Sequence, residues 1–324
     1  MIKLAIDAMG SDKGSSIAVE ASLQFVKDFD VELYVYGNAD ELQSLEGKDR
    51  IHVVKTTQVM EMTDGALAVR RKKDSSMVRA MEDLKNGVVD GVVSCASTGA
   101  LLSSATLILG TMEHVDRPAI ITVLPTSTKR GVILLDIGAN AVNTPQQLNQ
   151  FAVLGSAYAK GVRKIVDPKV GLLNIGSEAK KGDDLRKETY KLLENNEAIH
   201  FIGNVEGKEV LCSEADVVVC DGFTGNVLLK TIEGCSAFMT GSLKEKMMSS
   251  TISKIGALLS KKALKAMKAE LDPKQYGGAL ISGVNGAVVK GHGSSDAFAL
   301  YNAIRQLYTF VDTKVLDKIQ EELK

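Results

Sequence analysis

The chain of 324 residues lacks tryptophan, and aromatic residues of all kinds make up only 5% of it. Proteins that bind single-stranded nucleic acid generally need aromatic side chains interleaved with a basic stripe. Positive charge is not in excess either, because 39 lysines and arginines are balanced by 40 aspartates and glutamates. The composition therefore argues against a nucleic-acid partner, and any anion-binding site must be built locally.

The four cysteines are too few and too scattered for a disulfide framework. Cys95, Cys212, Cys220 and Cys235 stand among apolar neighbours, and no two of them have the C-x-x-C spacing of a zinc or redox site. This pattern predicts buried thiols in a reducing compartment. The four histidines show no metal-ligand spacing. We expect neither a metal nor another cofactor.

Long apolar runs are also missing, so no segment is long enough to cross a bilayer. The chain opens directly with residues 2–7, an apolar strand pattern rather than a signal peptide. The sequence therefore predicts a cytoplasmic protein that is still able to touch a membrane surface.

Short β-branched runs alternate with helical patterns along most of the chain, which is typical of parallel strands joined by crossover helices. The runs are almost continuously apolar, which indicates a sheet covered on both faces. The predicted strands are residues 2–7, 31–36, 51–54, 91–94, 119–124, 131–137, 170–175, 200–203, 215–220 and 287–291. The predicted helices include residues 16–29, 75–85, 144–159 and 183–193, and a closing helix from Ser295. We expect a single α/β unit over residues 1–324, with a mostly parallel sheet flanked by helices.

The segment 242–275 interrupts this alternation with a protruding helical excursion. It lacks strand patterns and is rich in lysine and methionine. Ile252, Ile255 and Leu259 share one helical stripe and are followed by Lys261 and Lys262. This pattern matches a pair of amphipathic helices, interrupted near Gly256, that lie on a membrane surface. A dimer surface or an acyl-chain groove explains the same apolar residues.

Several predicted strands end in turns of small residues, where open α/β sheets bind their ligands. Familiar nucleotide and nucleophile motifs are absent from these turns: residues 176–183 lack the Gly-Lys-Ser/Thr ending of a phosphate loop, and no G-x-G-x-x-G or G-x-S-x-G is present. Free backbone N–H groups at a helix N-terminus can still hold an anion such as phosphate. Five such turns predict a functional cleft, at residues 7–10, 95–99, 137–140, 175–177 and 221–226.

Two side chains in these turns are candidates for the chemistry. Lys181 follows the predicted strand 170–175, where a cation can hold phosphate or polarise a carbonyl oxygen, although a solvated lysine beside Lys180 explains it equally well. Asn226 ends a turn before a helix, so its amide can donate to a developing oxyanion, although helix capping is the commoner use of asparagine there. One oxyanion donor contributes about 3 kcal/mol to transition-state stabilisation, so a single amide is enough to matter.

Five runs of sequence, in order along nearly the whole chain, resemble the bacterial phosphate acyltransferase family of phospholipid synthesis. They are Arg71-Lys72-Lys73-Asp74-Ser75-Ser76-Met77-Val78, Leu135-Asp136-Ile137-Gly138-Ala139-Asn140, Leu172-Leu173-Asn174-Ile175-Gly176-Ser177-Glu178, the run 221–226 and the run 292–296. The resemblance implies a homodimer with a fold similar to the isopropylmalate dehydrogenase and phosphotransacetylase group. It also implies transfer of a long fatty acyl chain from acyl carrier protein to inorganic phosphate, which gives acyl phosphate for phosphatidic acid synthesis.

By position, the resemblance places the active-site lysine and asparagine of that family on Lys181 and Asn226. Further candidates for phosphate or substrate binding are Thr98, Gly99, Asn140, Asn174, Gly176, Thr224, Gly225, His292 and Ser294. The resemblance favours peripheral membrane contact, and its expected partners are acyl carrier protein and a downstream membrane acyltransferase. The chain departs from the family pattern at Ser11, Ala96, Ser97 and Val142, so no role is predicted for these residues.

Three other functions remain open at this point. A phosphotransacetylase that uses acyl-coenzyme A belongs to the same class of enzyme, and a dehydrogenase of the same fold would require a nicotinamide. A non-catalytic adaptor for a membrane or a carrier protein would release no thiol at all. Phosphate-dependent release of free thiol from acyl carrier protein distinguishes these possibilities.

Overall fold

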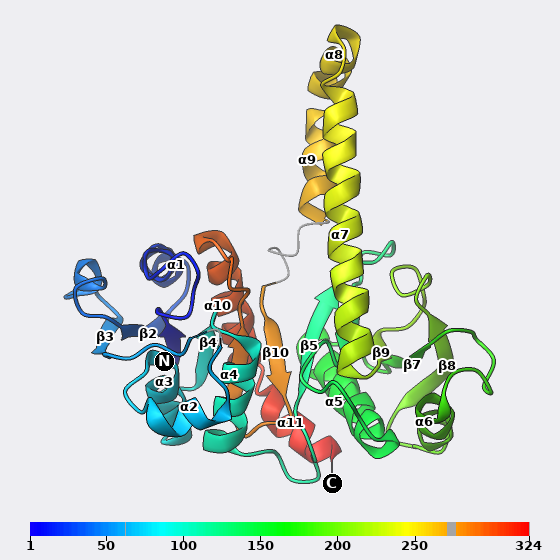
Figure 1. Ribbon diagram of the computed structural model, residues 1–324, viewed down its shortest axis with the longest axis horizontal. Coiled ribbons are helices and arrows are strands. Elements are labelled where there is room, and N and C mark those ends of the chain that lie inside the picture. Colours follow the sequence, from blue (N-terminus) through cyan, green and yellow to red (C-terminus); the bar gives the residue numbers. More distant parts are fainter. Residues whose placement is uncertain (62, 271–276, 324) are drawn as a thin grey trace.

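The computed structural model describes residues 1–61, 63–270 and 277–323 (Figure 1). Within these residues, eleven strands form one sheet in the order β3-β2-β1-β4-β11-β10-β5-β6-β9-β7-β8. The strands are β1 (Ile2–Asp7), β2 (Val31–Gly37), β3 (Ile51–Lys55), β4 (Gly91–Ser94), β5 (Ala119–Leu124), β6 (Val132–Leu135), β7 (Lys169–Asn174), β8 (His200–Glu206), β9 (Val217–Val219), β10 (Ala279–Ser282) and β11 (Ala287–Lys290).

Helices connect these strands and cover the sheet on both faces; in Figure 1, α1 and α3 lie on opposite sides of β1 and β2. The helices are α1 (Ser16–Asp28), α2 (Ala66–Arg71), α3 (Ser76–Lys85), α4 (Thr98–Ser104), α5 (Pro145–Arg163), α6 (Asp184–Glu194), α7 (Gly222–Met247), α8 (Thr251–Leu259), α9 (Lys261–Glu270), α10 (Ala297–Asp312) and α11 (Val315–Glu322). Two short segments add a 3-10 turn at Gln43–Leu45 and a π-helical turn at Ala105–Leu109.

Two hydrophobic cores lie on the two faces of the sheet. Along β1, Leu4 and Ile6 pack into one core and Ala5 into the other, and all three are fully buried. This alternation follows from the strand geometry, in which successive side chains point to opposite faces. It confirms the expectation that the apolar strands are covered on both sides.

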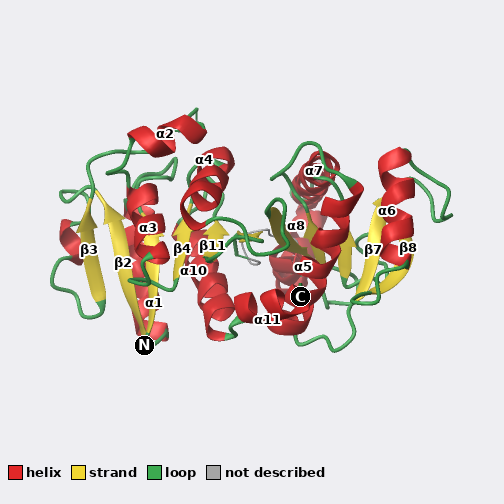
Figure 2. Ribbon diagram, turned by 90° about the horizontal axis from the view of Figure 1, so that it is seen from below, coloured by secondary structure: helices red, strands yellow, loops and turns green. Residues whose placement is uncertain are grey.

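The sheet is mostly parallel, as predicted, but it consists of two parallel halves. Strands β3, β2, β1, β4 and β11 form the first half, and β6, β9, β7 and β8 form the second. Between them, antiparallel pairing of β11 with β10, β10 with β5 and β5 with β6 reverses the strand direction three times. Because each strand is rotated by about 20–25° from its neighbour, the twist turns the carboxyl ends of both halves toward one side. Figure 2 shows α4 and α7, which follow β4 and β9, on that side.

Local sequence signals account for several element boundaries. Thr144 caps α5, accepting from Gln147 N while the Gln147 side chain accepts from Thr144 N, and Pro145 occupies the first position. The predicted strands 131–137 and 215–220 shorten to β6 and β9. Strand β10 is absent from the predicted strands, because it is only four residues long and lies between Gly278 and Gly283.

A long helical projection leaves the sheet at the carboxyl end of β9 (Figure 1). It consists of α7, which runs away from the sheet, and of α8 and α9, which fold back alongside it. The helix α7 thus starts well before the predicted excursion 242–275. The predicted break near Gly256 is wrong, because the chain breaks at residues 248–250 and at Ser260, and Gly256 lies inside α8. Residues 271–275 of the excursion lie outside the described part of the chain.

No helix in the described residues has both the length and the apolar character needed to span a bilayer.

All four cysteines are unpaired; Cys95 and Cys220 are buried, whereas Cys212 and Cys235 are exposed. The prediction of buried thiols is therefore wrong for two of the four. Cys235 lies on the projecting α7, and Cys212 lies in the loop before β9, where the apolar neighbours Val210 and Leu211 suggested a core position.

Candidate active site

The predicted site residues fall into two groups at the carboxyl ends of the strands. The first group follows β4 and β11 and contains Thr98, Gly99, His292 and Ser294. The second group lies at the ends of β6, β9 and β7 and contains Asn140, Asn174, Gly176, Lys181, Thr224, Gly225 and Asn226. Because β6, β9 and β7 are direct neighbours in the sheet, the structure places Lys181 and Asn226 on adjacent strand ends. Strands β10 and β5 separate the two groups.

Asp136 organises the turn that follows β6. Its carboxylate is fully buried and accepts backbone N–H groups from Ile120 at 3.1 Å and from residues 138–140 at 2.8–3.0 Å. Burial raises the pKa of Asp136, while these N–H donors act in the opposite direction. The side-chain amide of Asn140 donates to Pro118 O at 2.8 Å and to Asp136 at 3.1 Å. Asn140 therefore supports the turn from inside, where only 5% of the residue is exposed.

Asn226 packs against this turn from the first turns of α7. The prediction placed Asn226 at the end of a strand-to-helix turn, but the helix already begins at Gly222, with Asp221 as its cap. The Asn226 amide nitrogen donates to Ile137 O at 3.1 Å. A carboxamide carries two N–H donors, and this is the one hydrogen bond that Nδ2 makes within the described residues. The second N–H is available to a ligand.

Two glycines allow α7 to start this close to the Asp136 turn. A Cβ on Gly225 would lie 1.9 Å from Asp136 O, and a Cβ on Gly222 would lie 2.5 Å from Asn140 O. Both positions thus require the absence of a side chain. Gly225, a predicted binding residue, is explained by this close approach of the helix to the turn.

The loop between β7 and α6 presents Lys181 to solvent. The Asn174 amide donates to Lys181 O at 3.1 Å and to Asn204 at 3.1 Å, and Asn204 in turn donates to Glu178 O at 2.9 Å. These bonds hold the loop at Glu178 and at Lys181. The Lys181 side chain is 51% exposed, with its ammonium 3.9 Å from a Glu178 carboxylate oxygen. This loose contact leaves the ammonium accessible to an anion. Gly176 lies against the Lys181 side chain, since a Cβ there would approach it to 3.0 Å.

Arg186 links this loop to α7, and the sequence reasoning missed it. Its guanidinium donates to Asp183 at 2.8 Å, to Thr224 Oγ1 at 2.8 Å and to the Asp221 carboxylate. The Arg186 side chain is only 14% exposed. Asp183 caps α6 and Asp221 caps α7, so one guanidinium joins the N-termini of the two helices. The sequence contains each cap motif, but nothing in it indicates that the two helices meet.

The first group of turns is also held together by hydrogen bonds. Asp7, which is 4% exposed, accepts from the hydroxyls of Ser76 and Ser94, both at 2.6 Å, and burial raises its pKa. The Asp12 backbone N–H donates to Gly293 O at 3.1 Å. The turns after β1, β4 and β11 therefore form one continuous surface.

Within this surface, His292 Nδ1 and Ser294 Oγ are 2.8 Å apart and form a hydrogen bond with each other.

The structure also locates three residues for which no role is predicted. Ser97 caps α4 by accepting from Ala100 N at 3.1 Å, and the Ser11 hydroxyl donates to Gly293 O, whereas Val142 is 81% exposed. The first residues of α4 are less enclosed: Thr98 is partly buried, and Gly99 is exposed, with open space where a side chain would be.

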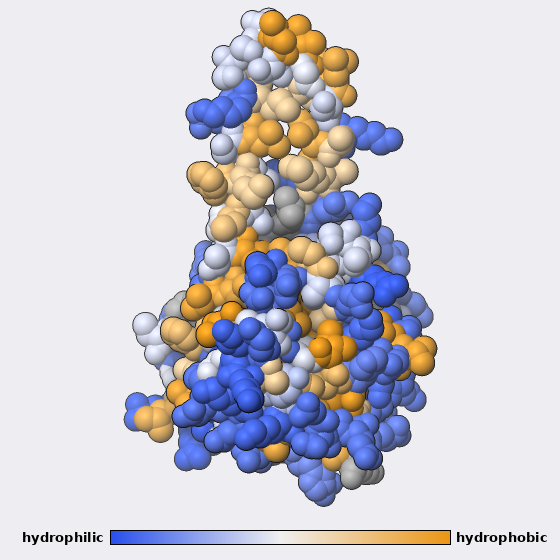
Figure 3. Space-filling view, turned by 90° about the vertical axis from the view of Figure 1, so that its right-hand side faces the viewer, coloured by the Kyte–Doolittle hydropathy of each residue, from blue (hydrophilic) through white to orange (hydrophobic). Residues whose placement is uncertain are grey.

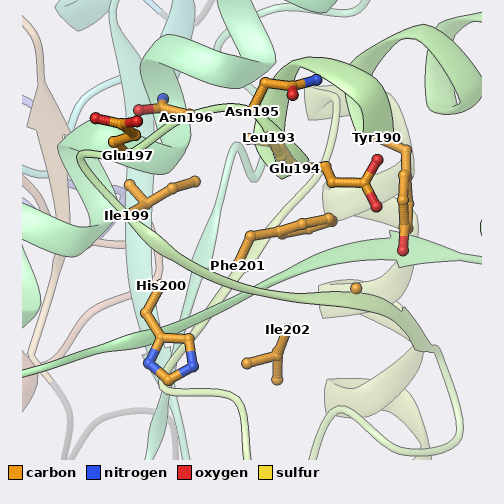
Figure 4. Close-up of a pocket in the computed structure, with 11 residues that line it drawn as sticks. Tyr190, Leu193, Glu194, Asn195, Asn196, Glu197, Ile199, His200, Phe201 and Ile202 are labelled. Atoms are coloured by element: carbon orange, nitrogen blue, oxygen red, sulfur yellow. The ribbon is translucent and has the colours of Figure 1, made fainter.

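A hollow of about 610 Å³ lies elsewhere on the molecule, between α6 and β8 (Figure 4). Tyr190, Glu194, His200 and Phe201 are among the residues that line it. These residues belong to the last turns of α6 and the first residues of β8, whereas Lys181 precedes the opposite end of α6. The hollow is therefore not part of the candidate active site.

Residues 2–318 match the family model described as "Fatty acid synthesis protein". The chain is 45% identical to proteins named "Phosphate acyltransferase" from Streptococcus pneumoniae, among them those of strains Spain 23F-1 and Hungary19A-6, over 326 aligned positions that cover 99% of each chain.

Solved structures with the same fold include two phosphotransacetylases. The chain is 18% identical to EutD phosphotransacetylase from Staphylococcus aureus, with a TM-score of 0.60 and coverage of 96% of this chain and 94% of that one. It is 17% identical to a phosphotransacetylase from Streptococcus pyogenes, with a TM-score of 0.62 and coverage of 98% and 94%. These likenesses confirm the predicted phosphotransacetylase-like fold. The chain belongs to the family of the phosphate acyltransferases named above, and it is an enzyme that transfers acyl groups.

Proposed function

We propose that this enzyme transfers a fatty acyl group from acyl carrier protein to inorganic phosphate, and that Lys181 and Asn226 carry the reaction. The observation behind the proposal is their placement: a half-exposed ammonium follows β7, and an amide with one N–H unused within the described residues lies in the first turns of α7, which follows the neighbouring strand β9. The fatty acid synthesis family supports a carrier-bound acyl donor.

In the proposed reaction, phosphate binds Lys181, and one of its oxygens attacks the carbonyl carbon of the thioester. The second N–H of the Asn226 amide donates to the oxyanion of the tetrahedral intermediate. A new carbon–oxygen bond forms, the carbon–sulfur bond breaks, and the proton lost by phosphate goes to the departing thiolate. Thioester and acyl phosphate are both activated acyl groups, so the protein contributes position and charge stabilisation rather than an energy source.

Phosphate-dependent release of free thiol tests the proposal, with acyl carrier protein and acyl-coenzyme A offered in parallel. We expect the carrier thioester to have the higher kcat/KM. Replacing Lys181 or Asn226 by alanine should lower kcat by about 100-fold or more, the scale of a lost oxyanion donor, while circular dichroism stays unchanged. Lys180→Ala is the matched control and should keep full activity. Full activity in both site variants would overturn the assignment.

One of the alternatives survives the comparisons. Membership in a family of acyl-transferring enzymes sets aside the dehydrogenase and the non-catalytic adaptor. An enzyme that uses acyl-coenzyme A remains, and the phosphotransacetylase-like fold favours it as the second candidate. A higher kcat/KM for acyl-coenzyme A in the assay above would establish it.

The tip of the projection supports a proposed membrane contact. Ile252, Ile255 and Leu259 on α8 are 84%, 56% and 82% exposed, and the exposed Lys261 and Lys262 follow. Figure 3 shows apolar side chains gathered at the far end of the projection, with hydrophilic ones beside them. An apolar tip with neighbouring lysines suits the surface of an anionic bilayer, where a membrane acyltransferase can take up acyl phosphate. Co-sedimentation with anionic vesicles should be lost in Ile255→Glu/Leu259→Glu; unchanged binding would remove the proposal.

A second copy of the chain is the proposed partner of α7. In this helix of 26 residues, Gly222 and Gly225 are the buried ones among those described, and Phe238 and Met239 are 76% and 67% exposed. Contiguous apolar surface of this kind is typical of an interface. A homodimer that pairs its α7 helices would cover these side chains.

A further inference from the structure

The end of α2 carries cations that have no partner. Arg70 and Arg71 form its last residues, Lys73 follows two positions after Arg71, and all three are exposed. Lys72 differs from them, because it is partly buried and pairs with Asp64 at 2.6 Å. Within the part of the chain that the structure describes, Arg70, Arg71 and Lys73 form no ion pair. Together these three residues are the α2 basic surface.

The α2 basic surface lies next to the first group of strand-end turns. Helix α2 packs on α4, and Figure 2 shows the two helices side by side. Helix α4 begins with Thr98 and Gly99, two of the predicted binding residues. In the other direction the chain continues directly into α3, where the Ser76 hydroxyl donates to Asp7 at the end of β1. The cations are therefore anchored beside the first group of strand-end turns, outside the turns themselves.

Three exposed and unpaired cations attract an acidic partner. The net charge of the whole chain is only −1, so this attraction is local to the α2 basic surface. A small anion would need donors that converge in a buried site, and these side chains extend from an exposed helix end. A bilayer is also a poor fit: the apolar residues that suit it lie at the tip of α8, and Figure 1 shows α2 low on the body, far from that tip. An acidic protein surface matches the arrangement best.

We propose that Arg70, Arg71 and Lys73 dock an acidic face of the carrier protein that delivers the acyl thioester. Leu67 lies one helical turn before Arg70 and Arg71 and is 68% exposed, so it provides an apolar contact beside the charges. The inference rests on the proposed function, because a carrier protein must stay on the surface while its thioester reaches the strand ends.

Charge reversal tests the docking. In the variant Arg70→Glu/Arg71→Glu/Lys73→Glu we expect the KM for acyl carrier protein to rise about tenfold or more, with kcat unchanged. Turnover of a free acyl pantetheine thioester, which has no protein part, should stay at the wild-type rate. The matched control is Lys27→Glu/Lys48→Glu/Lys85→Glu, which makes the same change in net charge with exposed lysines elsewhere on the surface. Added salt should raise the carrier KM of the wild type and the control, and should lower that of the docking variant, whose new carboxylates repel the acidic carrier face.

Four results would overturn the docking proposal, and they can be told apart. An unchanged carrier KM in the docking variant removes the surface from recognition. Equal losses with the carrier and the pantetheine thioester indicate damage to the site. If the docking variant loses binding to anionic vesicles but keeps its carrier KM, the cations bind lipid rather than the carrier protein. A wild-type enzyme that does not turn over the carrier thioester refutes the proposed function itself, and the docking proposal with it.

Discussion

At the scale of single residues, Arg186 has the clearest structural consequence. Its guanidinium joins the loop that contains Lys181 to the helix that contains Asn226. Its partner Asp221 is only 5% exposed. Removing one member of such a pair leaves the other charge buried without compensation. Arg186 is thus expected to act as a positioning residue, affecting catalysis through two neighbours rather than by touching the substrate.

Arg186→Ala should lower the free energy of unfolding by about 3 kcal/mol and should also lower kcat at temperatures where the variant is fully folded. Arg186→Lys should not restore kcat. The planar guanidinium donates to Asp183, Asp221 and Thr224 at once, and a compact ammonium cannot make all three hydrogen bonds. Urea denaturation and phosphate-dependent thiol release measure the two effects. Lys187→Ala is the control; its side chain is 46% exposed and its ammonium lies 3.8 Å from Asp184, so its loss should change stability by about 0.5 kcal/mol or less. An Arg186→Ala enzyme with wild-type kcat would show that the link does not matter for catalysis.

The cysteines give a second prediction at this scale. Burial raises the pKa of the Cys95 thiol to about 11, and the thiolate is the form that reacts with alkylating agents. At pH 8, iodoacetamide should therefore modify the exposed Cys212 quickly and leave Cys95 and the buried Cys220 unmodified until the protein unfolds. Peptide mass spectrometry over time measures each rate. Alkylation of Cys95 in the native enzyme at the rate of Cys212 would contradict its buried position.

At the scale of elements, the start of α7 shows where sequence reasoning succeeds and where it stops. The run 221–226 is predicted as a glycine-rich turn, because glycine disfavours helix interiors. In the structure the same glycines are helical, since they let α7 approach Asp136, a residue that directly follows the distant strand β6. Local propensity therefore placed Asn226 correctly after a strand, but it predicted a turn where the structure has a helix.

The same division applies to the rest of the fold. Most parallel strands could be predicted, because strands buried on both faces are continuously apolar over a few residues. The pairing of β10 between β11 and β5 could not, because a strand of four residues between glycines has no local signature. Lys181 and Asn226 are candidates because of their turns and because of the family resemblance. Arg186 was not identified, because its role depends on two helix caps that meet only in the folded chain.

Gly225 allows this element-scale explanation to be tested. Gly225→Ala should destabilise the protein by about 3 kcal/mol or more, because the added Cβ would stand 1.9 Å from Asp136 O and force α7 away from its turn. Gly256→Ala, inside α8, has nothing within 4 Å of the added carbon and should be neutral or stabilising by up to about 1 kcal/mol. Thermal and urea unfolding of the two variants compare them directly. Equal stability of both would mean that α7 does not start against the Asp136 turn.

At the scale of the whole molecule, apolar side chains of the projection such as Phe238 and Met239 are exposed to solvent in a single chain. If α7 pairs with α7 of a second copy, the wild type should sediment as a dimer, and Phe238→Glu/Met239→Glu should sediment as a monomer because two carboxylates per helix oppose burial. Cys235, which lies on the same helix, should be alkylated faster in this variant than in the wild type, and Cys212 should react equally in both. A wild type that is monomeric at micromolar concentration would contradict the pairing.

If α7 pairs in this way, dimerisation and membrane contact should be coupled through the shape of the projection. A two-fold axis along paired α7 helices places both α8 tips at the same end of the assembly, so two apolar tips can enter one bilayer together. The second contact is intramolecular once the first has formed, and such bivalency strengthens binding by about 100-fold or more without any new contact. Phe238→Glu/Met239→Glu should therefore bind anionic vesicles at least tenfold more weakly than the wild type, even though Ile252, Ile255 and Leu259 are intact. Vesicle titration at concentrations where the wild type is dimeric measures this difference, and equal binding of the two proteins would show that each tip acts alone.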